Sequence, residues 1–395
     1  MKQGWEIKKL EEVVTFQRGL TYSKNDEVEF SCNGVLRSNN IDLDTMSLVF
    51  DELKYVREDL VIAPDKKLSK GSILICMSNG SKQHLGKVAF IDKDYDYAFG
   101  GFMGLIKPND DICAKYIYYT CISSSYKHFL AGVGCGANIT NLKFADLAQY
   151  TIPVPERAEQ ERIVGELDCL SGIIAAKRAQ LRELDTLAQS IFYTMFGDPI
   201  TNDKGWQTKK WESVYETKLG KMLDAKKQND NDIVCPYIAN LNVKWGRFDL
   251  ENLKTMTFSL KEIELYKLQK GDLLICEGGE AGRCAIWDKS DSNILYQKAI
   301  HRSRVKNQDI NSYYTLYFLY NFRKQGGLKD YLSKSTIEHL TREKLNTLRL
   351  PIPPIALQNE FAKKIEQIEK QKQLIKASIT ETEDLFNSRM NYYFD

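Results

Sequence analysis

Residues 152–197 read IPVPERAEQERIVGELDCLSGIIAAKRAQLRELDTLAQSIFYTMFG, and this stretch predicts a long helix that begins after two prolines. From Ile163 onward, apolar residues recur with alternating spacings of four and three, a heptad pattern that is broken once, at Lys177. Gly197 and Pro199 predict the helix end, because glycine suits the C-terminal cap and proline cannot continue a helix. The apolar seam consists of Ile163, Leu167, Leu170, Ile174, Leu181, Leu184 and Ile191.

A narrow apolar stripe cannot bury itself, so this helix needs a partner, and residues 354–395 supply one. The second stretch also follows two prolines, Pro351 and Pro353, and keeps the four-three spacing with Lys372 and Thr382 as interruptions. We expect the two helices to pair as an antiparallel coiled coil. The alternative is that each helix packs only on its own lobe. The second seam consists of Phe361, Ile365, Ile368, Ile375, Ile379 and Phe386.

The similarity of the two helices is part of a repeat that covers the whole chain of 395 residues. Gly4-Trp5 recurs as Gly205-Trp206, and Leu74-Ile75-Cys76 recurs as Leu274-Ile275-Cys276. Two equivalent halves therefore follow one another. We expect a first lobe over residues 1–155, a central helix over 156–197, a second lobe over 198–353 and a C-terminal helix over 354–395.

Each lobe is expected to mix strands and helices. Short apolar runs bounded by Gly, Asn and Asp predict strands at 72–77, 87–91, 272–276 and 284–287. Helical patterns cover residues 115–130 and 312–331. The predicted fold class is α+β, with two tandem, pseudo-repeated lobes separated by two long antiparallel helices.

Composition excludes several classes of protein. Hydrophobic residues make up 43% of the chain, which excludes wholesale disorder, and no apolar run approaches the roughly 20 residues that span a bilayer. The start of the chain does not resemble a secretory signal, and the nine cysteines form no C-x-x-C pair, so we expect a cytoplasmic protein with reduced thiols. The net charge of +2 hides an asymmetry, since residues 201–350 carry +7.

No segment of the sequence matches a known catalytic motif. The glycine-rich segment from Gly80 to Val88 has the wrong spacing for a phosphate-binding loop and lacks its Ser or Thr. The segments at 132–136 and 278–282 lack the dinucleotide-binding spacing, and the four histidines form no zinc motif. We therefore expect no catalysis, no metal site and no bound cofactor in this chain.

Taken together, the stretch IPVPERAEQERI at 152–163, the heptads behind it, MFGDP at 195–199 and Gly205-Trp206 resemble the specificity subunit of Type I restriction-modification systems. The resemblance covers nearly the whole chain, although Ala356-Leu-Gln358-Asn359 departs from the usual Ala-Glu-Gln-Glu in the second copy. It implies a non-catalytic subunit whose lobes are target-recognition domains, each reading one half of a split DNA sequence in a system of DNA methylation and phage defence.

The resemblance also implies partners. The helix pair would set the spacing of the half-sites and dock two adenine methyltransferase (modification) subunits, and motor-nuclease (restriction) subunits would join them. S-adenosylmethionine, ATP and Mg would be bound by these partner subunits.

The second lobe has the side chains that a DNA-reading surface needs, which are cations for phosphates and amides or guanidinium groups for base edges. Strand alternation across 298–306 would place His301 on the face opposite Arg302 and Arg304. The alternatives are an edge strand protected by charge, and a solvated loop at Lys226-Lys227. The candidates of this lobe are Lys221, Lys226, Lys227, Arg247, Arg283, Lys298, Arg302 and Arg304.

The first lobe is not basic, but three stretches rich in amides, at 37–40, 78–84 and 138–143, have the chemistry to bond adenine or guanine. They also suit ordinary turns, and that alternative stays open. The loop after Gly80 is longer than its counterpart at 277–283, as expected if the lobes read different half-sites. The candidates of this lobe are Arg37, Asn39, Asn40, Asn79, Lys82, Gln83, Asn138, Asn141 and Lys143.

The sequence leaves three alternatives to this function. The chain could be the recognition subunit of another restriction-modification assembly with the same lobes, or a coiled-coil scaffold whose lobes bind protein rather than DNA. A self-sufficient methyltransferase is disfavoured because the chain lacks the (Asn/Asp)-Pro-Pro-aromatic tetrapeptide. A steep dependence of DNA binding on salt would separate a DNA reader from a scaffold.

Overall fold

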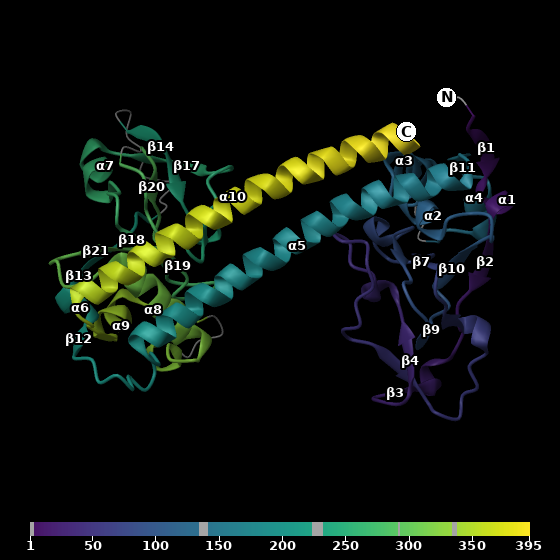
Figure 1. Ribbon diagram of the computed structural model, residues 1–395. Helices are drawn as coiled ribbons and strands as arrows, with labels where there is room; N and C mark the ends of the chain where they lie inside the picture. The colour runs from purple at the N-terminus through teal and green to yellow at the C-terminus, as the bar shows by residue number, and fades with distance from the viewer. Residues whose placement is uncertain (1–3, 134–140, 223–231, 291–292, 334–337) are drawn as a thin grey trace. The chain divides into compact units, whose positions relative to one another are not determined.

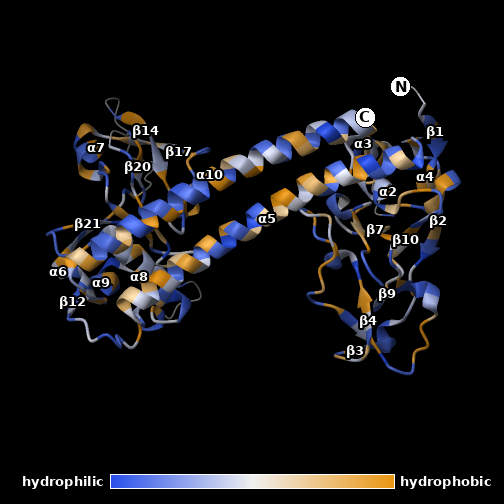
Figure 2. Cartoon of the chain, in the orientation of Figure 1, coloured by the Kyte–Doolittle hydropathy of each residue, from blue (hydrophilic) through white to orange (hydrophobic). Residues whose placement is uncertain are grey.

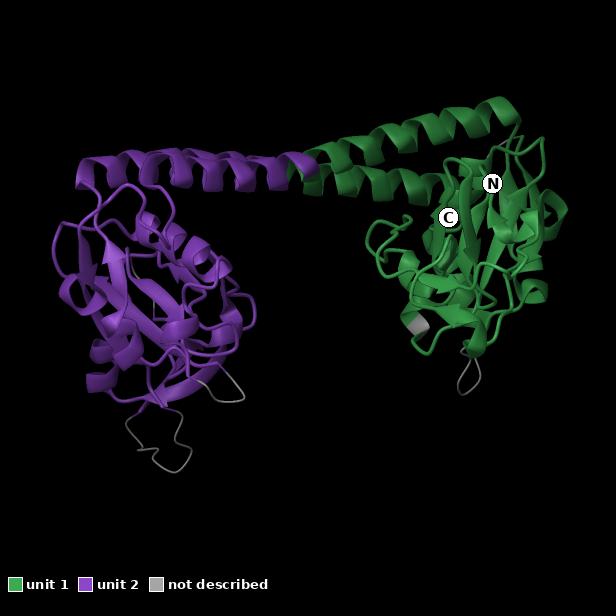
Figure 3. Ribbon diagram, turned by 90° about the horizontal axis from the view of Figure 1, so that it is seen from below, with its two compact units in different colours: residues 1–178, 377–395 green, residues 179–376 purple. Residues whose placement is uncertain are grey.

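The computed structural model describes residues 4–133, 141–222, 232–290, 293–333 and 338–395. The chain forms two compact units, one made of residues 1–178 and 377–395 and the other of residues 179–376 (Figure 3). Each unit contains one lobe together with part of both long helices. The predicted boundaries at 155, 197 and 353 divide the chain by element instead, and they stay predictions.

The first lobe is built on an antiparallel sheet of order β2-β10-β7-β8 and a second sheet of order β3-β5-β4-β9-β6 (Figure 1). Alternate residues of β7 face two different cores, Ile73 and Ile75 one cluster and Leu74 and Cys76 another. A strand covered on both faces needs a continuous apolar run, which explains the sequence ILIC. The strands are β1 Glu6–Lys9, β2 Val14–Arg18, β3 Glu27–Val28, β4 Asn33–Leu36, β5 Lys54–Val56, β6 Lys67–Leu68, β7 Ile73–Cys76, β8 Val88–Phe90, β9 Tyr95–Phe99, β10 Met103–Pro108 and β11 Thr151–Val154.

The second lobe repeats this plan with a sheet of order β13-β21-β18-β19 and a smaller sheet of order β17-β14-β20. β21 lies between β13 and β18, so the alternative of a charged edge strand over 298–306 is wrong. The strands are β12 Thr208–Lys210, β13 Tyr215–Leu219, β14 Ile233–Ile238, β15 Val243–Lys244, β16 Arg247–Phe248, β17 Lys254–Phe258, β18 Leu273–Cys276, β19 Cys284–Ile286, β20 Leu295–Tyr296, β21 Ile300–Val305 and β22 Arg349–Pro351.

The helical patterns at 115–130 and 312–331 also form helices, although a break at Cys121–Ser123 divides the first of them. The short helices belong to the two lobes, where Ala114–Thr120 and Ser312–Lys324 pack on the main sheets, and the α+β class is confirmed. They are α1 Leu10–Val13, α2 Ala114–Thr120, α3 Ser124–Val133, α4 Phe144–Ala148, α6 Trp211–Val214, α7 Leu260–Tyr266, α8 Ser312–Lys324 and α9 Arg342–Thr347.

The two predicted long helices are α5, Arg157–Phe196, and α10, Ile355–Phe394, each of 40 residues. They run antiparallel within each unit, because the start of α5 contacts the end of α10 and the reverse holds in the other unit. Glu166 pairs with Arg389 over 2.8 Å in the first unit, and Asp185 pairs with Lys372 over 2.8 Å in the second. Hydrophobic residues recur along both helices in Figure 2, and all thirteen predicted seam positions are buried or half-buried.

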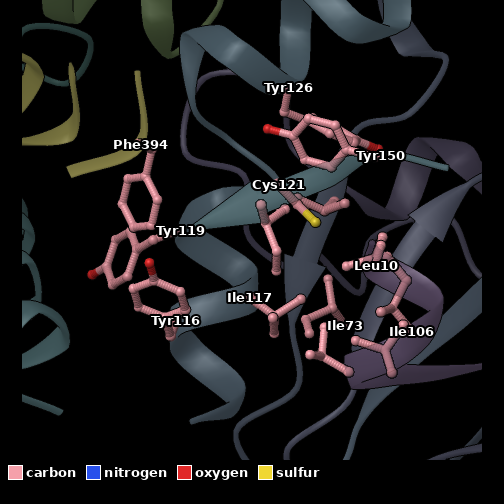
Figure 4. Close-up of a cluster of buried hydrophobic side chains, with 14 of the residues drawn as sticks. Leu10, Ile73, Ile106, Tyr116, Ile117, Tyr119, Cys121, Tyr126, Tyr150 and Phe394 are labelled. Atoms are coloured by element: carbon pink, nitrogen blue, oxygen red, sulfur yellow. The ribbon is translucent and has the colours of Figure 1, made fainter. Parts of the chain in front are cut away.

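The helices also pack on the lobes. Ile163 and Leu167 of α5 lie in the core of the first lobe. Phe394 of α10 lies there too, and the centroid of its ring is 5.2 Å from that of the Tyr116 ring (Figure 4). The expected pairing of the two helices is therefore confirmed and the alternative that each packs only on its own lobe is wrong, although both helices also pack on the lobes.

The interruptions of the seam are polar contacts between the helices. Lys177 Nζ donates to Ser378 Oγ over 2.6 Å and to Thr382 Oγ1 over 3.1 Å. Lys372 forms its ion pair with Asp185 in the same way, from a half-buried position. Polar groups inside such a seam favour one register over others, because any shift would leave them without partners.

A buried glutamine fixes the start of each long helix to its lobe. Gln160 is 1% exposed; its Nε2 donates to Pro155 O over 2.9 Å, and its Oε1 accepts from Cys113 N over 2.9 Å. In the second unit Gln358 bonds Pro353 O and Asn311 N in the same manner. The glutamine that follows each proline pair in the sequence thus anchors the start of the long helix to the lobe.

Candidate nucleic-acid interface

Three stretches of the first lobe that lie far apart in the sequence meet just beyond the ends of β4 and β7. Asn79 Nδ2 donates to Ser38 Oγ over 2.8 Å, which joins the first predicted stretch to the second. Ser78 forms a β-bridge with Asn141, and Leu142 N donates to Met77 O over 2.7 Å, which joins the second to the third. We call residues 37–40, 78–84 and 141–143 turn cluster 1.

Some of the residues predicted to bind DNA in turn cluster 1 have side chains that could reach DNA, whereas others are already hydrogen-bonded within the protein. Asn40 is fully buried, accepts from Arg37 N and donates to two backbone carbonyls, so its amide shapes the turn and is closed to bases. Asn39 donates to Glu52 O over 3.4 Å. Asn138 and the side chain of Lys82 lie outside the described residues. Arg37 and Asn79 are half-buried, and Gln83, Asn141 and Lys143 are exposed.

Arg37 is the predicted cation that lies at the start of turn cluster 1. Its Nε is buried and makes no hydrogen bond within the described part of the chain. Nε of Arg283 and Nε of Arg302 share this feature, so it does not by itself indicate a ligand. The Arg37 side chain as a whole is only half-buried, and a guanidinium group can donate to a guanine edge or a phosphate. Arg37 is therefore the first candidate for a base or phosphate contact in this lobe.

A cation, buried in the first lobe and half-buried in the second, holds each lobe's turn against its sheet. Lys87 is 5% exposed and its Nζ donates to Ile41 O over 2.6 Å, while burial lowers the pKa of this ammonium group. In the second lobe, Arg283 Nη2 donates to Asn240 O over 2.8 Å. Each cation follows a glycine with positive φ, Gly86 or Gly282. The sequence interpretation missed Lys87, although the alignment of the two glycines was a signal for it.

The second lobe assembles the equivalent surface, turn cluster 2, from residues 240–242, 277–283 and 338–341. Leu340 N donates to Glu277 O over 2.7 Å, and Arg283 joins Glu280 to Asn240. His301 Nε2 donates to Leu340 O over 2.8 Å, on the opposite strand face from Arg302, so the expected alternation is confirmed. Burial lowers the pKa of the His301 imidazole.

Several cations predicted to bind DNA in this lobe are held by carboxylates. The side chain of Arg302 is 3% exposed and contacts Glu216 over 3.1 Å. Arg304 forms two hydrogen bonds of 2.7 Å with the buried Asp272. These two arginines are not part of the proposed interface, because contact with DNA would require Arg302 to leave its buried position and Arg304 to abandon the buried Asp272.

The remaining predicted cations of the second lobe differ in exposure. Lys221 pairs with Glu262 over 2.6 Å, and Arg283 is held by Glu280 and Asn240. Lys298 and Arg247 are exposed and stay candidates for phosphate contacts. Lys226 and Lys227 lie outside the described residues.

Within the described ranges, no group of three or more His, Cys, Asp or Glu side chains has the arrangement of a metal site. No helix found there combines the length and the apolar character needed to cross a membrane.

A family model for the Type I restriction modification DNA specificity domain matches residues 2–185 and again residues 203–384. The chain belongs to this family. The two matches coincide with the repeat, each covering one lobe and most of the long helix that follows it. The resemblance seen in the sequence is confirmed.

Curated relatives span the same length. The chain is 26% identical to the specificity subunit of the Type I restriction enzyme EcoKI from Escherichia coli K12, over 93% of this chain and 82% of the relative. It is also 26% identical to the StySPI specificity subunit from Salmonella potsdam, with the same coverage.

Solved structures share the fold. A chain from a structure on complex assembly and conformational transition of the type I R-M system superposes with a TM-score of 0.60 at 16% identity, over 99% of this chain and 97% of the other. The S subunit of a Type I system from M. genitalium gives a TM-score of 0.57 at 14% identity, over 100% and 98%.

Proposed function

We propose that this chain, as the DNA-specificity subunit of a Type I restriction-modification complex, reads one half of a split duplex target with each turn cluster. The chain is a non-catalytic part of such a complex. The observation that supports this reading mode is the meeting of three distant stretches in each lobe, through Asn79–Ser38 and Ser78–Asn141 in the first. The lobes extend over residues 1–155 and 198–353.

The two clusters share a backbone frame but not their side chains. Arg37 N bonds Asn40 Oδ1 in the first lobe, and Ala239 N bonds Asn242 Oδ1 in the second. The side chain before the turn is thus an arginine in one lobe and an alanine in the other. Equal frames with different side chains are what two readers of different sequences need.

The finer partners follow from the family. Two adenine methyltransferase subunits would dock on the helix pair, and motor-nuclease subunits would join them in the cytoplasm. S-adenosylmethionine, ATP and Mg would be bound by those subunits. The helix pair, with its polar register contacts, would set the unread gap between the half-sites.

The test uses the complex with its modification subunits. Methylated adenines in genomic DNA are mapped by long-read sequencing, and the target found is then used in binding assays at several salt concentrations. A split target and an affinity that falls steeply with salt are expected, because neutralised phosphates release counterions. A scaffold would give no specific target and no such slope, and either result would overturn the proposal.

A residue test assigns the first half-site. Arg37→Ala should weaken binding about 5- to 150-fold, the range expected from losing ~1–3 kcal/mol at a base contact. Arg57→Ala is the matched control, because Arg57 is exposed and pairs with Asp26 and Asp59 beyond β5, away from turn cluster 1. Equal effects of the two substitutions would remove Arg37 from the interface.

A further inference from the structure

An exposed aromatic ring projects beside turn cluster 1. Phe102 lies in the turn between β9 and β10 and is 73% exposed. Its carbonyl accepts hydrogen bonds from Met77 N over 2.9 Å and from Ser78 N over 3.2 Å. The backbone that carries the ring is therefore hydrogen-bonded to the backbone of Met77 and Ser78, and Ser78 belongs to turn cluster 1.

The turn that carries Phe102 has little freedom to move. Gly100 N donates to Leu36 O and Met103 N donates to Gly100 O, which ties the turn to the strand that leads into Arg37. A Cβ atom at Gly19 would lie 2.1 Å from Gly100 O, so the neighbouring backbone packs directly against this turn. The backbone of this turn is thus held by several contacts, while the ring that it carries stays exposed to solvent.

The second lobe does not repeat this ring. Glu277 N donates to Ala299 O just as Met77 N donates to Phe102 O, so Ala299 occupies the equivalent place. The exposed apolar residue of turn cluster 2 is instead Leu241, which is 70% exposed and occupies the position of Asn39. Turn cluster 2 thus contains an exposed apolar side chain, and turn cluster 1 has one directly beside it, at a different point of the shared frame.

We propose that Phe102 is a base-contacting residue of the first lobe, and that its ring packs against the bases of the first half-site while Arg37 and the amides bond their edges. Apolar side chains read DNA through the thymine methyl group or by wedging at a base step, and neither contact neutralises a phosphate. Leu241 is its counterpart for the second half-site. The inference rests on the proposed function of the turn clusters.

Salt dependence separates a base contact from a general one. Phe102→Ala should lower the affinity of the assembled complex for its target about 5- to 150-fold, a typical range for one base contact, with an unchanged slope of log K against log salt. Leu241→Ala should lower the affinity in the same way. Because Phe102 is exposed, the thermal unfolding of the variant should match that of the parent.

Phe30→Ala is the matched control. Phe30 is 78% exposed, belongs to the same lobe and precedes β4, so it lies at the end of that strand opposite to Arg37. It should leave binding unchanged. A second measurement uses targets with one half-site scrambled: Phe102→Ala should lose little further affinity when the first half-site is already scrambled, and should still lose its full share when only the second is.

The outcomes distinguish the two hypotheses. If the parent complex shows no specific target, the proposed function fails. If the parent binds specifically but Phe102→Ala behaves like Phe30→Ala, only the assignment of Phe102 is overturned. Equal weakening on specific and scrambled DNA, or loss of the methyltransferase subunits from the variant, would also overturn that assignment.

Discussion

Replacing Gln160 by alanine should destabilise the first unit far more than a surface substitution on the same type of helix. The change leaves Pro155 O and Cys113 N without their partner at a site that is 1% exposed. An unsatisfied buried group costs ~1–3 kcal/mol, so about 3 kcal/mol is expected for the pair after local relaxation. For a unit of this size, that corresponds to a fall of roughly 6–12 °C in Tm.

The assay should report on each unit separately, since a chain with two units need not unfold in a single step. Calorimetry gives the Tm, and hydrogen exchange at the Cys113 amide reports the junction directly. Gln373→Ala is the control, because Gln373 is exposed on α10 and alanine is the better helix former. Gln358→Ala should shift the transition of the other unit. If Gln160→Ala and Gln373→Ala gave the same Tm and the same exchange rate, the junction argument would be refuted.

Three further predictions concern folding and spacing. Arg304→Ala should destabilise the second unit by ~3–5 kcal/mol in chemical denaturation, because it leaves the carboxylate of Asp272 buried and unpaired; a folded variant with altered half-site recognition would instead return Arg304 to the interface. Leu181→Asp should abolish site-specific binding before it unfolds the lobes, as judged by circular dichroism, since a carboxylate enters the helix seam; normal binding would show that Leu181 lies outside the seam. Inserting one heptad after Arg178 and another after Lys376, where the units divide, lengthens each long helix by about 10.5 Å, which equals about three base pairs of DNA. Methylation mapping should then show a wider gap between two half-sites whose sequences are unchanged. A gap of unchanged length would contradict the role of the helices as a spacer.

Much of the architecture was predictable because it rests on local periodicity. The heptad spacing of the two long helices is visible in one dimension, and so is the all-apolar run at Ile73–Cys76 that demands a strand with both faces covered. Because the chain is a repeat, each of these patterns occurs in both halves, and a pattern that occurs twice at the same offset is seldom accidental.

The site was harder to predict, because the availability of a side chain depends on partners that are distant in sequence. Arg302 and Arg304 are part of a conspicuous basic run, but their carboxylate partners are 86 and 32 residues away. Asn40 has the chemistry to bond adenine, and only the fold shows that Val49 O and Asp51 O already engage its amide. Sequence chemistry identified the stretches, and packing decided which members remain free.

The first unit closes around residues from both ends of the chain. Met390, Tyr393 and Phe394 lie in its core, and Ser125 N donates to Asp395 Oδ1 across a separation of 270 residues. At a synthesis rate of about 5–20 residues per second, the first lobe waits roughly fifteen to fifty seconds on the ribosome before its last core side chains exist. The second lobe, whose core residues are contiguous in the chain, can finish first. The lobe that is synthesised first is thus the one that completes its folding last. Until the end of the chain is synthesised, its apolar face stays exposed, and chaperones can bind there.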